Sequence, residues 1–343
     1  MILAAIAATT AAAGVLHYAD APAVAAFIVA GVALAGVAWV VALATEALGE
    51  RFGPGMTGLL QSTLGNLPEF FVVLFALDAG EVLVAKTSLV GSLLANGLLV
   101  LGLAIVVGAR AAPDGVMRFA PRLPNDTMTL LMLAVFIIVI LGIATSSHDE
   151  AGRHSEAISA VASICLLFVY GAWLFSYLRS DTAAVEMPGG PELTLTATIS
   201  LLAGAGVAAA FVSEWFIDAL SPAIGSLGIS RAFAGLVIVA IAGNAVENTT
   251  ALLLARKGNS DLAISVVKNS VAQIAVFLFP ALILVSLVFT TPLTFVLPPV
   301  YIASLALASI AIWQITGDGE AREYEGAALV ALFVIVAAVA WFQ

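Results

Sequence analysis

The sequence predicts an all-α integral membrane protein with about 11 transmembrane helices, because it is apolar, sparsely charged and built from long apolar runs. Of its 343 residues, 62% are hydrophobic and only 10% are charged, whereas soluble domains carry roughly 25% charged residues. Apolar and polar residues alternate in a transmembrane β-barrel, and these runs are continuous. The formal net charge of −10 disfavours nucleic acid as a partner, and the lipid bilayer is the expected environment.

Charged, Pro-rich and Gly-rich breaks divide the chain into eleven candidate spans. These are residues 1–19, 22–45, 55–79, 82–108, 126–145, 157–178, 193–220, 231–255, 261–289, 292–315 and 326–343. The first could instead be a cleaved signal, although no Lys or Arg precedes Arg51.

The distribution of Lys and Arg predicts the orientation of the chain, since these residues are enriched in cytoplasmic loops. With eleven spans, eight lie in loops on the N-terminal side and three in loops on the other side. We therefore expect a multi-pass plasma-membrane protein with a cytoplasmic N-terminus.

Two short segments indicate an internal repeat. Residues 64–69 read LGNLPE and residues 242–247 read AGNAVE, so both contain Gly-Asn-x-x-Glu. A serine follows each glutamate at the same separation, as Ser92 and Ser270. The motifs fall in the third and eighth candidate spans, which places five spans in each repeat.

The expected organisation is an N-terminal helix (1–21), a first five-helix repeat (22–178), a linker (179–192) and a second five-helix repeat (193–343). An odd number of helices per repeat gives the two copies opposite orientations in the membrane. Inverted repeats are typical of secondary transporters, whose site lies near the bilayer midplane.

The chemistry of the motifs centres on Glu69 and Glu247, which lie too deep in their spans to reach water. An acidic residue at that depth is expensive and indicates function. Two such carboxylates close together cannot both remain ionised without a cation or protons. We therefore predict that they form a metal site that holds one divalent cation or protons in turn, which is antiport.

Neighbouring residues supply further oxygen ligands. Gly65 and Gly243 would let the helix open and expose carbonyl oxygens, and Asn66 and Asn244 would add amide oxygens. Carboxylate, carbonyl and amide oxygens suit calcium. Close helix packing or helix–helix hydrogen bonding are the alternative roles for these residues.

The GNLPE and GNAVE pair resembles the signature repeats of the calcium/proton antiporters of the cation/calcium exchanger superfamily, and the similarity extends over roughly 44–104 and 212–285. The resemblance implies that Glu69 and Glu247 carry calcium and protons. It also implies supporting roles for Asn66, Asn244, Ser92, Ser270 and Gln273. Calcium and protons would be transported substrates, and no cofactor is expected.

Three positions depart from the family pattern and bear on the coupling ion. Asn248 stands where the family often has His, Ala240 where it often has Pro, and Lys268 lies in a stretch that is usually small and Gly-Ser-rich. Lys268 would either extend to the membrane surface or lie near the site in place of a cation. A sodium/calcium exchanger of the same superfamily is therefore the alternative.

Two other classes of protein fit less well. An intramembrane enzyme would need a nucleophile with a base, a metal triad or paired aspartates within its spans, and the sequence contains none of these. A channel is disfavoured by the repeat topology. We therefore expect no enzymatic activity.

Overall fold

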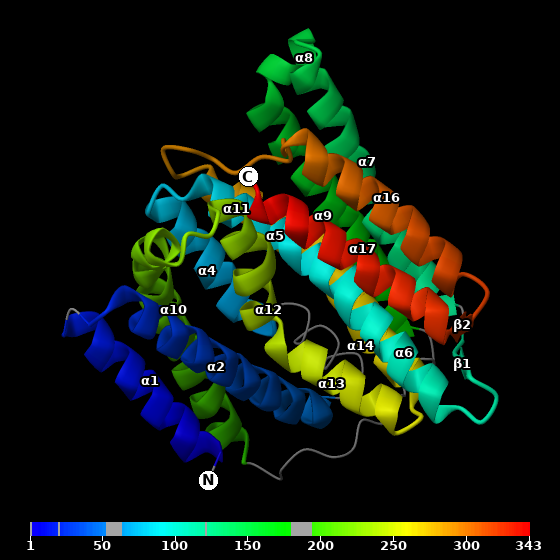
Figure 1. Cartoon of the computed structure of the whole chain (residues 1–343), viewed down its shortest axis with the longest axis horizontal. Helices are drawn as coiled ribbons and strands as arrows, with labels where there is room; N and C mark the ends of the chain where they lie inside the picture. Colours follow the sequence, from blue (N-terminus) through cyan, green and yellow to red (C-terminus); the bar gives the residue numbers. More distant parts are fainter. Residues whose placement is uncertain (1, 20, 53–63, 121, 180–193) are drawn as a thin grey trace.

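The computed structural model describes residues 2–19, 21–52, 64–120, 122–179 and 194–343. The predicted linker 179–192 lies almost entirely outside these residues. The described chain is overwhelmingly helical, as predicted (Figure 1). Its helices are α1 (Ile2–Tyr18), α2 (Ala23–Phe52), α4 (Leu67–Asp78), α5 (Val82–Leu94), α6 (Leu101–Ala111), α7 (Arg122–Ser146), α8 (Glu150–Arg153), α9 (Ser155–Arg179), α10 (Leu195–Leu227), α11 (Arg231–Phe233), α12 (Ala240–Gly243), α13 (Ala245–Arg256), α14 (Ser260–Gln273), α15 (Phe279–Ser286), α16 (Pro299–Thr316) and α17 (Glu323–Trp341).

Short π-helical segments join several of these helices into longer spans. They are η1 (Ala95–Val100), η3 (Ala234–Val239) and η4 (Ile274–Leu278). As a result, α5, η1 and α6 form one span over Val82–Ala111, and α14, η4 and α15 form another over Ser260–Ser286. π-Helical turns within α-helices are frequent at functional sites.

The number of membrane-crossing helices differs from the sequence prediction. Among the described residues, eight helices are long and apolar enough to cross a membrane, and one bent pair brings the number to nine. The expected count of eleven is not confirmed. α1 has 17 residues and α4 has 12, whereas a span needs about 20 residues.

One predicted span begins later than expected. The apolar run predicts a span that starts at residue 292, but α16 begins at Pro299. The preceding segment TPLTFVLP is not helical, and its alternate residues Leu293, Phe295 and Leu297 are buried. Prolines interrupt helix formation here, and Lys86 on α5 holds the segment by donating to the carbonyl oxygen of Val296 at 2.8 Å.

The span Val82–Ala111 runs between two opposite faces of the protein, and each end of the span marks one face. At one end, β1 (Val116–Arg118) pairs antiparallel with β2 (Glu320–Arg322), and the backbone N–H of Ala120 donates to Asp261. We call this end the ribbon face; it comprises residues 112–120, 257–259 and 317–322 (Figure 1). The opposite end, with the turns 79–81 and 228–230 and the hairpin 147–154, is called the Glu81 face.

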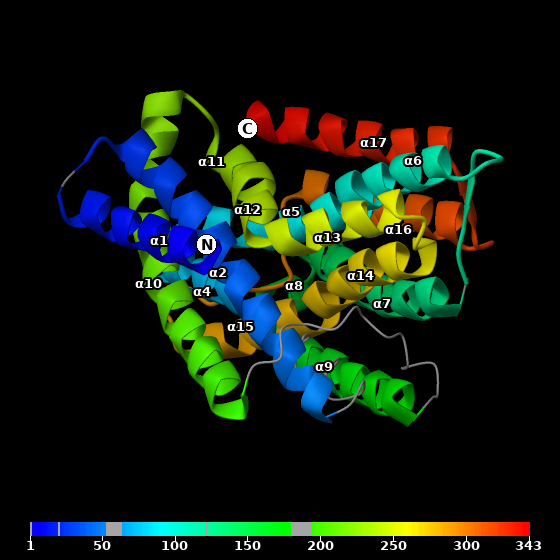
Figure 2. The same ribbon diagram turned by 90° about the horizontal axis from the view of Figure 1, so that it is seen from below.

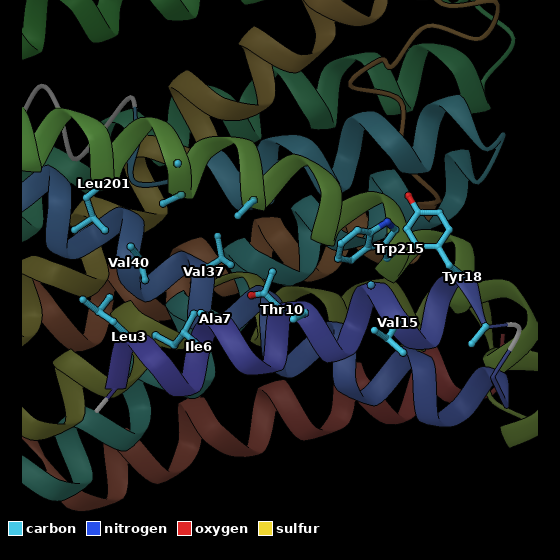
Figure 3. A pocket seen from close by; sticks show the side chains of 16 residues that line it. Leu3, Ile6, Ala7, Thr10, Val15, Tyr18, Val37, Val40, Leu201 and Trp215 are labelled. Carbon is cyan, nitrogen blue, oxygen red and sulfur yellow. The ribbon is translucent and has the colours of Figure 1, made fainter.

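α1, α2 and α10 pack together as one group, which Figure 2 shows at one side of the molecule. A groove of about 880 Å³ runs between α1 and α10, with α2 at its floor (Figure 3). Its walls are apolar or small side chains such as Leu3, Ala7, Val37 and Gly204, with Trp215 near one end. No charged residue lines the groove, so it is unsuited to bind a cation.

Candidate cation and proton site

At the asparagine of both Gly-Asn-x-x-Glu motifs the backbone departs from helical geometry, and it does so in a similar way. Asn66 has φ −90° and ψ 12°, and Asn244 has φ −107° and ψ 19°. The carbonyl oxygen of Asn66 accepts from the N–H of Phe70 at 2.9 Å, and that of Asn244 accepts from the N–H of Asn248 at 3.0 Å. Around Asn244 the two helix halves meet at a bend of 63°.

The breaks place each glutamate in the first turn of a new helix. Glu69 lies in the first turn of α4 and Glu247 in the first turn of α13. Unpaired backbone N–H groups make the N-terminal end of a helix electropositive, which favours a carboxylate there. From their breaks, α4 runs toward the Glu81 face and α13 toward the ribbon face, so the two copies have opposite directions.

The structure brings the two acidic side chains of the motifs together. Glu69 and Glu247 are close enough for their carboxyl groups to repel each other. A Cβ atom added to Gly243 would lie 3.9 Å from the Cβ of Glu69, which places the second motif directly against the first glutamate.

The surroundings of the two carboxylates differ. Glu69 is 3% exposed, and neither carboxylate oxygen has a hydrogen-bond partner among the described residues. Ser92 and Asn244 face the Glu69 carboxylate closely enough to interact with it. Glu247 is only partly buried. Burial makes an ionised carboxylate costly, and a bound proton or cation at Glu69 would lower that cost.

A chain of amide and hydroxyl groups crosses from one repeat to the other beside the acids. Asn244 donates to the Oγ of Ser92 at 2.9 Å. Asn96 on η1 donates to the Oδ1 of Asn244 at 3.1 Å and to the Oγ of Ser270 at 3.0 Å. Both predicted serines and one predicted asparagine thus belong to a single buried network.

Sequence reasoning missed Asn96, although the residue carries a recognisable signal. It is an amide within the apolar stretch GSLLANGLLVLG, four positions after Ser92 and therefore on the same face of the helix. Its position in the second repeat is occupied by Ile274. Comparison of the two repeats therefore does not reveal Asn96, because it identifies only residues that occur in both copies.

The remaining predicted residues lie around this network. Asn66 is buried next to Glu69, and its side-chain nitrogen has no hydrogen-bond partner among the described residues. Gly65 forms part of the helix break, and Gln273 lies partly buried at the end of α14.

Lys268 was expected either to extend to the membrane surface or to lie near the site, and the structure shows its side chain buried inside the protein. It is 3% exposed and does not reach water. Its Nζ donates to the Oγ1 of Thr316 at 2.7 Å, at the C-terminal end of α16. A cation is favourable at a helix C-terminus, so this contact directs the ammonium toward the ribbon face.

Glycines allow two spans from different repeats to touch backbone to backbone beside the site. A Cβ atom at Gly91 would lie 2.2 Å from the carbonyl oxygen of Leu236, and one at Gly235 would lie 2.1 Å from the Oγ1 of Thr87. Small residues permit this close approach in membrane proteins. The contact holds α5, which carries Ser92, against the half-helix that leads to Asn244.

The donor set is made of hard oxygen atoms. In the part of the chain that the structure describes, no group of three or more His, Cys, Asp or Glu residues is placed to hold a metal. Two carboxylates with amide and hydroxyl oxygens nevertheless provide the type of ligand that calcium prefers. Thiolate or imidazole ligands, which suit softer metals, are not part of this site.

The fold brings two inverted Gly-Asn-x-x-Glu motifs together among membrane-crossing helices, which is an arrangement typical of secondary transporters. The family described as "Sodium/calcium exchanger protein" matches residues 22–178 and 197–342, and the chain belongs to this family.

Individual relatives and solved structures resemble the chain over nearly its whole length. The chain is 31% identical to the Ca(2+)/H(+) antiporter of Synechocystis sp., with 92% of this chain and 91% of the relative covered. It is 32% identical to the Ca(2+)/H(+) antiporter ChaA of Bacillus subtilis, with 86% and 85% covered. The structure of native YfkE has a TM-score of 0.84 at 28% identity and full coverage of both chains. The predicted resemblance and the helical membrane fold are thereby confirmed.

Proposed function

We propose that this protein exchanges calcium for protons across a membrane, with Glu69 and Glu247 binding the cation and the protons in turn. The observation that carries the proposal is that two oppositely directed helix starts place the buried Glu69 directly against the second motif, which carries Glu247. The names of the antiporters from Synechocystis and Bacillus subtilis support the same exchange. No enzymatic role is proposed.

The physical basis is charge compensation in a medium of low dielectric constant. With no ion bound, the two carboxylates repel each other and Glu69 is buried, so the empty site takes up protons. When calcium enters, its charge replaces that of the protons, which leave. An empty site with two ionised carboxylates is unfavourable, and so is a site that holds calcium and the protons at the same time. Binding of calcium is therefore coupled to release of the protons.

The other site residues have supporting roles in this proposal. Asn66 and Asn244 supply amide oxygens and hold the broken backbone, and Gly65 and Gly243 leave carbonyl oxygens accessible. Ser92, Ser270 and Gln273 add side-chain oxygens, and Asn96 orients Asn244 and Ser270 by donating to both.

For the location, we propose the plasma membrane with the ribbon face and the N-terminus in the cytoplasm. Arg110, Arg118, Arg256, Lys257 and Arg322 lie at or next to the ribbon face, whereas Lys86, Arg153 and Arg231 lie toward the Glu81 face. Positively charged residues are enriched on the cytoplasmic side, which supports this orientation.

The direct test is calcium uptake into proteoliposomes driven by an imposed pH gradient. E69Q and E247Q should each lower the rate of uptake by about 100-fold or more, because each removes one of the two negative charges that compensate the charge of the bound calcium ion. E214Q is the matched control, since Glu214 is an exposed carboxylate on α10, and it should transport normally. Uptake that requires sodium and ignores the pH gradient would instead identify a sodium/calcium exchanger. Retained transport in E69Q or E247Q would remove that acid from the mechanism.

A further inference from the structure

One carboxylate at the Glu81 face joins three elements of the two repeats. Glu81 is only 16% exposed, and its Oε2 lies 3.0 Å from the Nε of Arg231. Its Oε1 accepts a hydrogen bond of 2.6 Å from the Oγ of Ser221. Glu81 forms the turn between α4 and α5, Ser221 belongs to α10, and Arg231 begins the half-helix that ends at the second motif.

These contacts join elements that carry or lead to residues of the site. α4 carries Glu69, and α5 carries Ser92. The half-helix from Arg231 leads to Asn244. A path from the site to the Glu81 face must separate these elements from one another, so an ion pair that spans them opposes the opening.

The corresponding turn of the second repeat has the same backbone but a different side chain. Gly80 and Gly258 have φ values of 75° and 78°. The N–H of Glu81 donates to the carbonyl oxygen of Ala76, and the N–H of Asn259 donates in the same way to that of Leu254. Asn259 is neutral, so the turn that faces the ribbon cannot form the equivalent ion pair.

We propose that Glu81 is a positioning residue that holds the site closed toward the Glu81 face through Arg231 and Ser221, and so biases the exchanger to open toward the ribbon face. This inference rests on the proposed function of the site. It goes beyond that function because it assigns a one-sided gate to a residue that touches neither the ion nor the motif glutamates.

The expected size of the effect follows from the exposure of the pair. Arg231 is 57% exposed, so the pair is partly screened by solvent. Loss of a pair of this kind should increase the population open toward the Glu81 face by up to about fivefold.

The test measures opening directly and needs no transport. Thr87 is fully buried against Gly235, below the Glu81–Arg231 pair, so T87C serves as a reporter. It is introduced in a C165S background, because Cys165 is the only native cysteine. The full chain is reconstituted in liposomes, and a membrane-impermeant thiol reagent is applied from the Glu81 face.

E81Q should increase the rate of labelling of the T87C reporter by about fivefold. The charge-reversed combination of E81R with R231E should restore the slow rate, which a general loosening of the fold would not do. E150Q is the matched control: it breaks an ion pair of 3.4 Å with Arg153 in the hairpin of the same face, and labelling should stay slow.

If E81Q does not fold, R231Q breaks the same pair and leaves Glu81 bonded to Ser221. Unchanged labelling in a folded E81Q or R231Q protein would overturn the inference. Because labelling is independent of exchange, that result is distinct from failure of the proposed function, which E69Q and E247Q test.

Discussion

The two motif regions are nearly identical in backbone but unequal in environment. Glu69 is sealed at 3% exposure, whereas Glu247 is partly exposed. Asn244 makes hydrogen bonds across to the first repeat, whereas the side-chain nitrogen of Asn66 has none among the described residues. Asn96 has Ile274 at its corresponding position.

The two motifs are alike in sequence, but their environments differ because the structure shows one conformation of the exchanger. In inverted-repeat transporters, alternating access is largely the rocking of one repeat or bundle against the other. We therefore expect the environments of Glu69 and Glu247 to become more alike, or to exchange, when the protein opens to the opposite face.

The largest effect is expected from N244A, which tests the difference between the two motif asparagines. N244A removes the group that bonds Ser92 and Asn96 and leaves both with unpaired buried polar atoms, at a cost of about 1–3 kcal/mol. The apparent affinity for calcium should fall by up to about 100-fold, measured in the proteoliposome uptake assay. N66A should have a smaller effect; equal effects would show that Asn66 binds the ion as directly as Asn244 does.

The next prediction separates close helix packing from exposure of carbonyl oxygens. G91A places a methyl group 2.2 Å from the carbonyl oxygen of Leu236, so it should destabilise the protein by about 1–3 kcal/mol. G243A meets only the Cβ of Glu69, at an ordinary 3.9 Å, and its thermal stability should be unchanged. Thermal unfolding in detergent checks both. A loss of stability in G243A that equals the loss in G91A would contradict this reading.

A smaller effect is expected at Lys268, whose position in the first repeat is occupied by Val90. K268M removes the hydrogen bond to Thr316 but fills the same buried space with an apolar chain, so stability should change by no more than about 1 kcal/mol. Exchange should be retained. K86M, which releases Val296, is the comparison. Loss of pH-driven uptake in K268M alone would give Lys268 a role in coupling.

The smallest effect is expected in the exposed loop of the ribbon face. The Arg118 guanidinium beside Asp114 holds the pKa of that carboxyl below its usual range. The pair therefore stabilises the fold above the usual carboxyl pKa, and this contribution is lost as the pH falls through the lowered pKa. D114N should leave thermal stability nearly unchanged at neutral pH. A large loss of stability in D114N would show that the loop contributes more to the stability of the β-ribbon than its exposure indicates.

Much of this molecule was predictable from sequence because hydrocarbon restricts the possible structures so strongly. Long apolar runs in a bilayer must form helices that satisfy their own backbone groups, and the helical membrane fold is confirmed. The motif residues Glu69 and Glu247 were recognisable because acids at that depth are rare. Their role in exchange stays a prediction.

The number of spans and the start of α16 were less predictable. Hydropathy does not distinguish a membrane-crossing helix from the non-helical, largely buried segment that precedes Pro299, since both are apolar. Asn96 escaped for a different reason, because it has no partner in the other repeat.

By itself, the sequence determined the solvent in which this protein folds, the helical character of the chain and the presence of two acidic motifs at helix breaks. These properties depend on local composition and spacing. Only the tertiary structure decided that Asn96 bridges the repeats, that Lys268 turns to Thr316 and that Glu81 meets Arg231. Such contacts join residues far apart in the chain, and they form only when the packing of helices brings the residues within hydrogen-bonding distance.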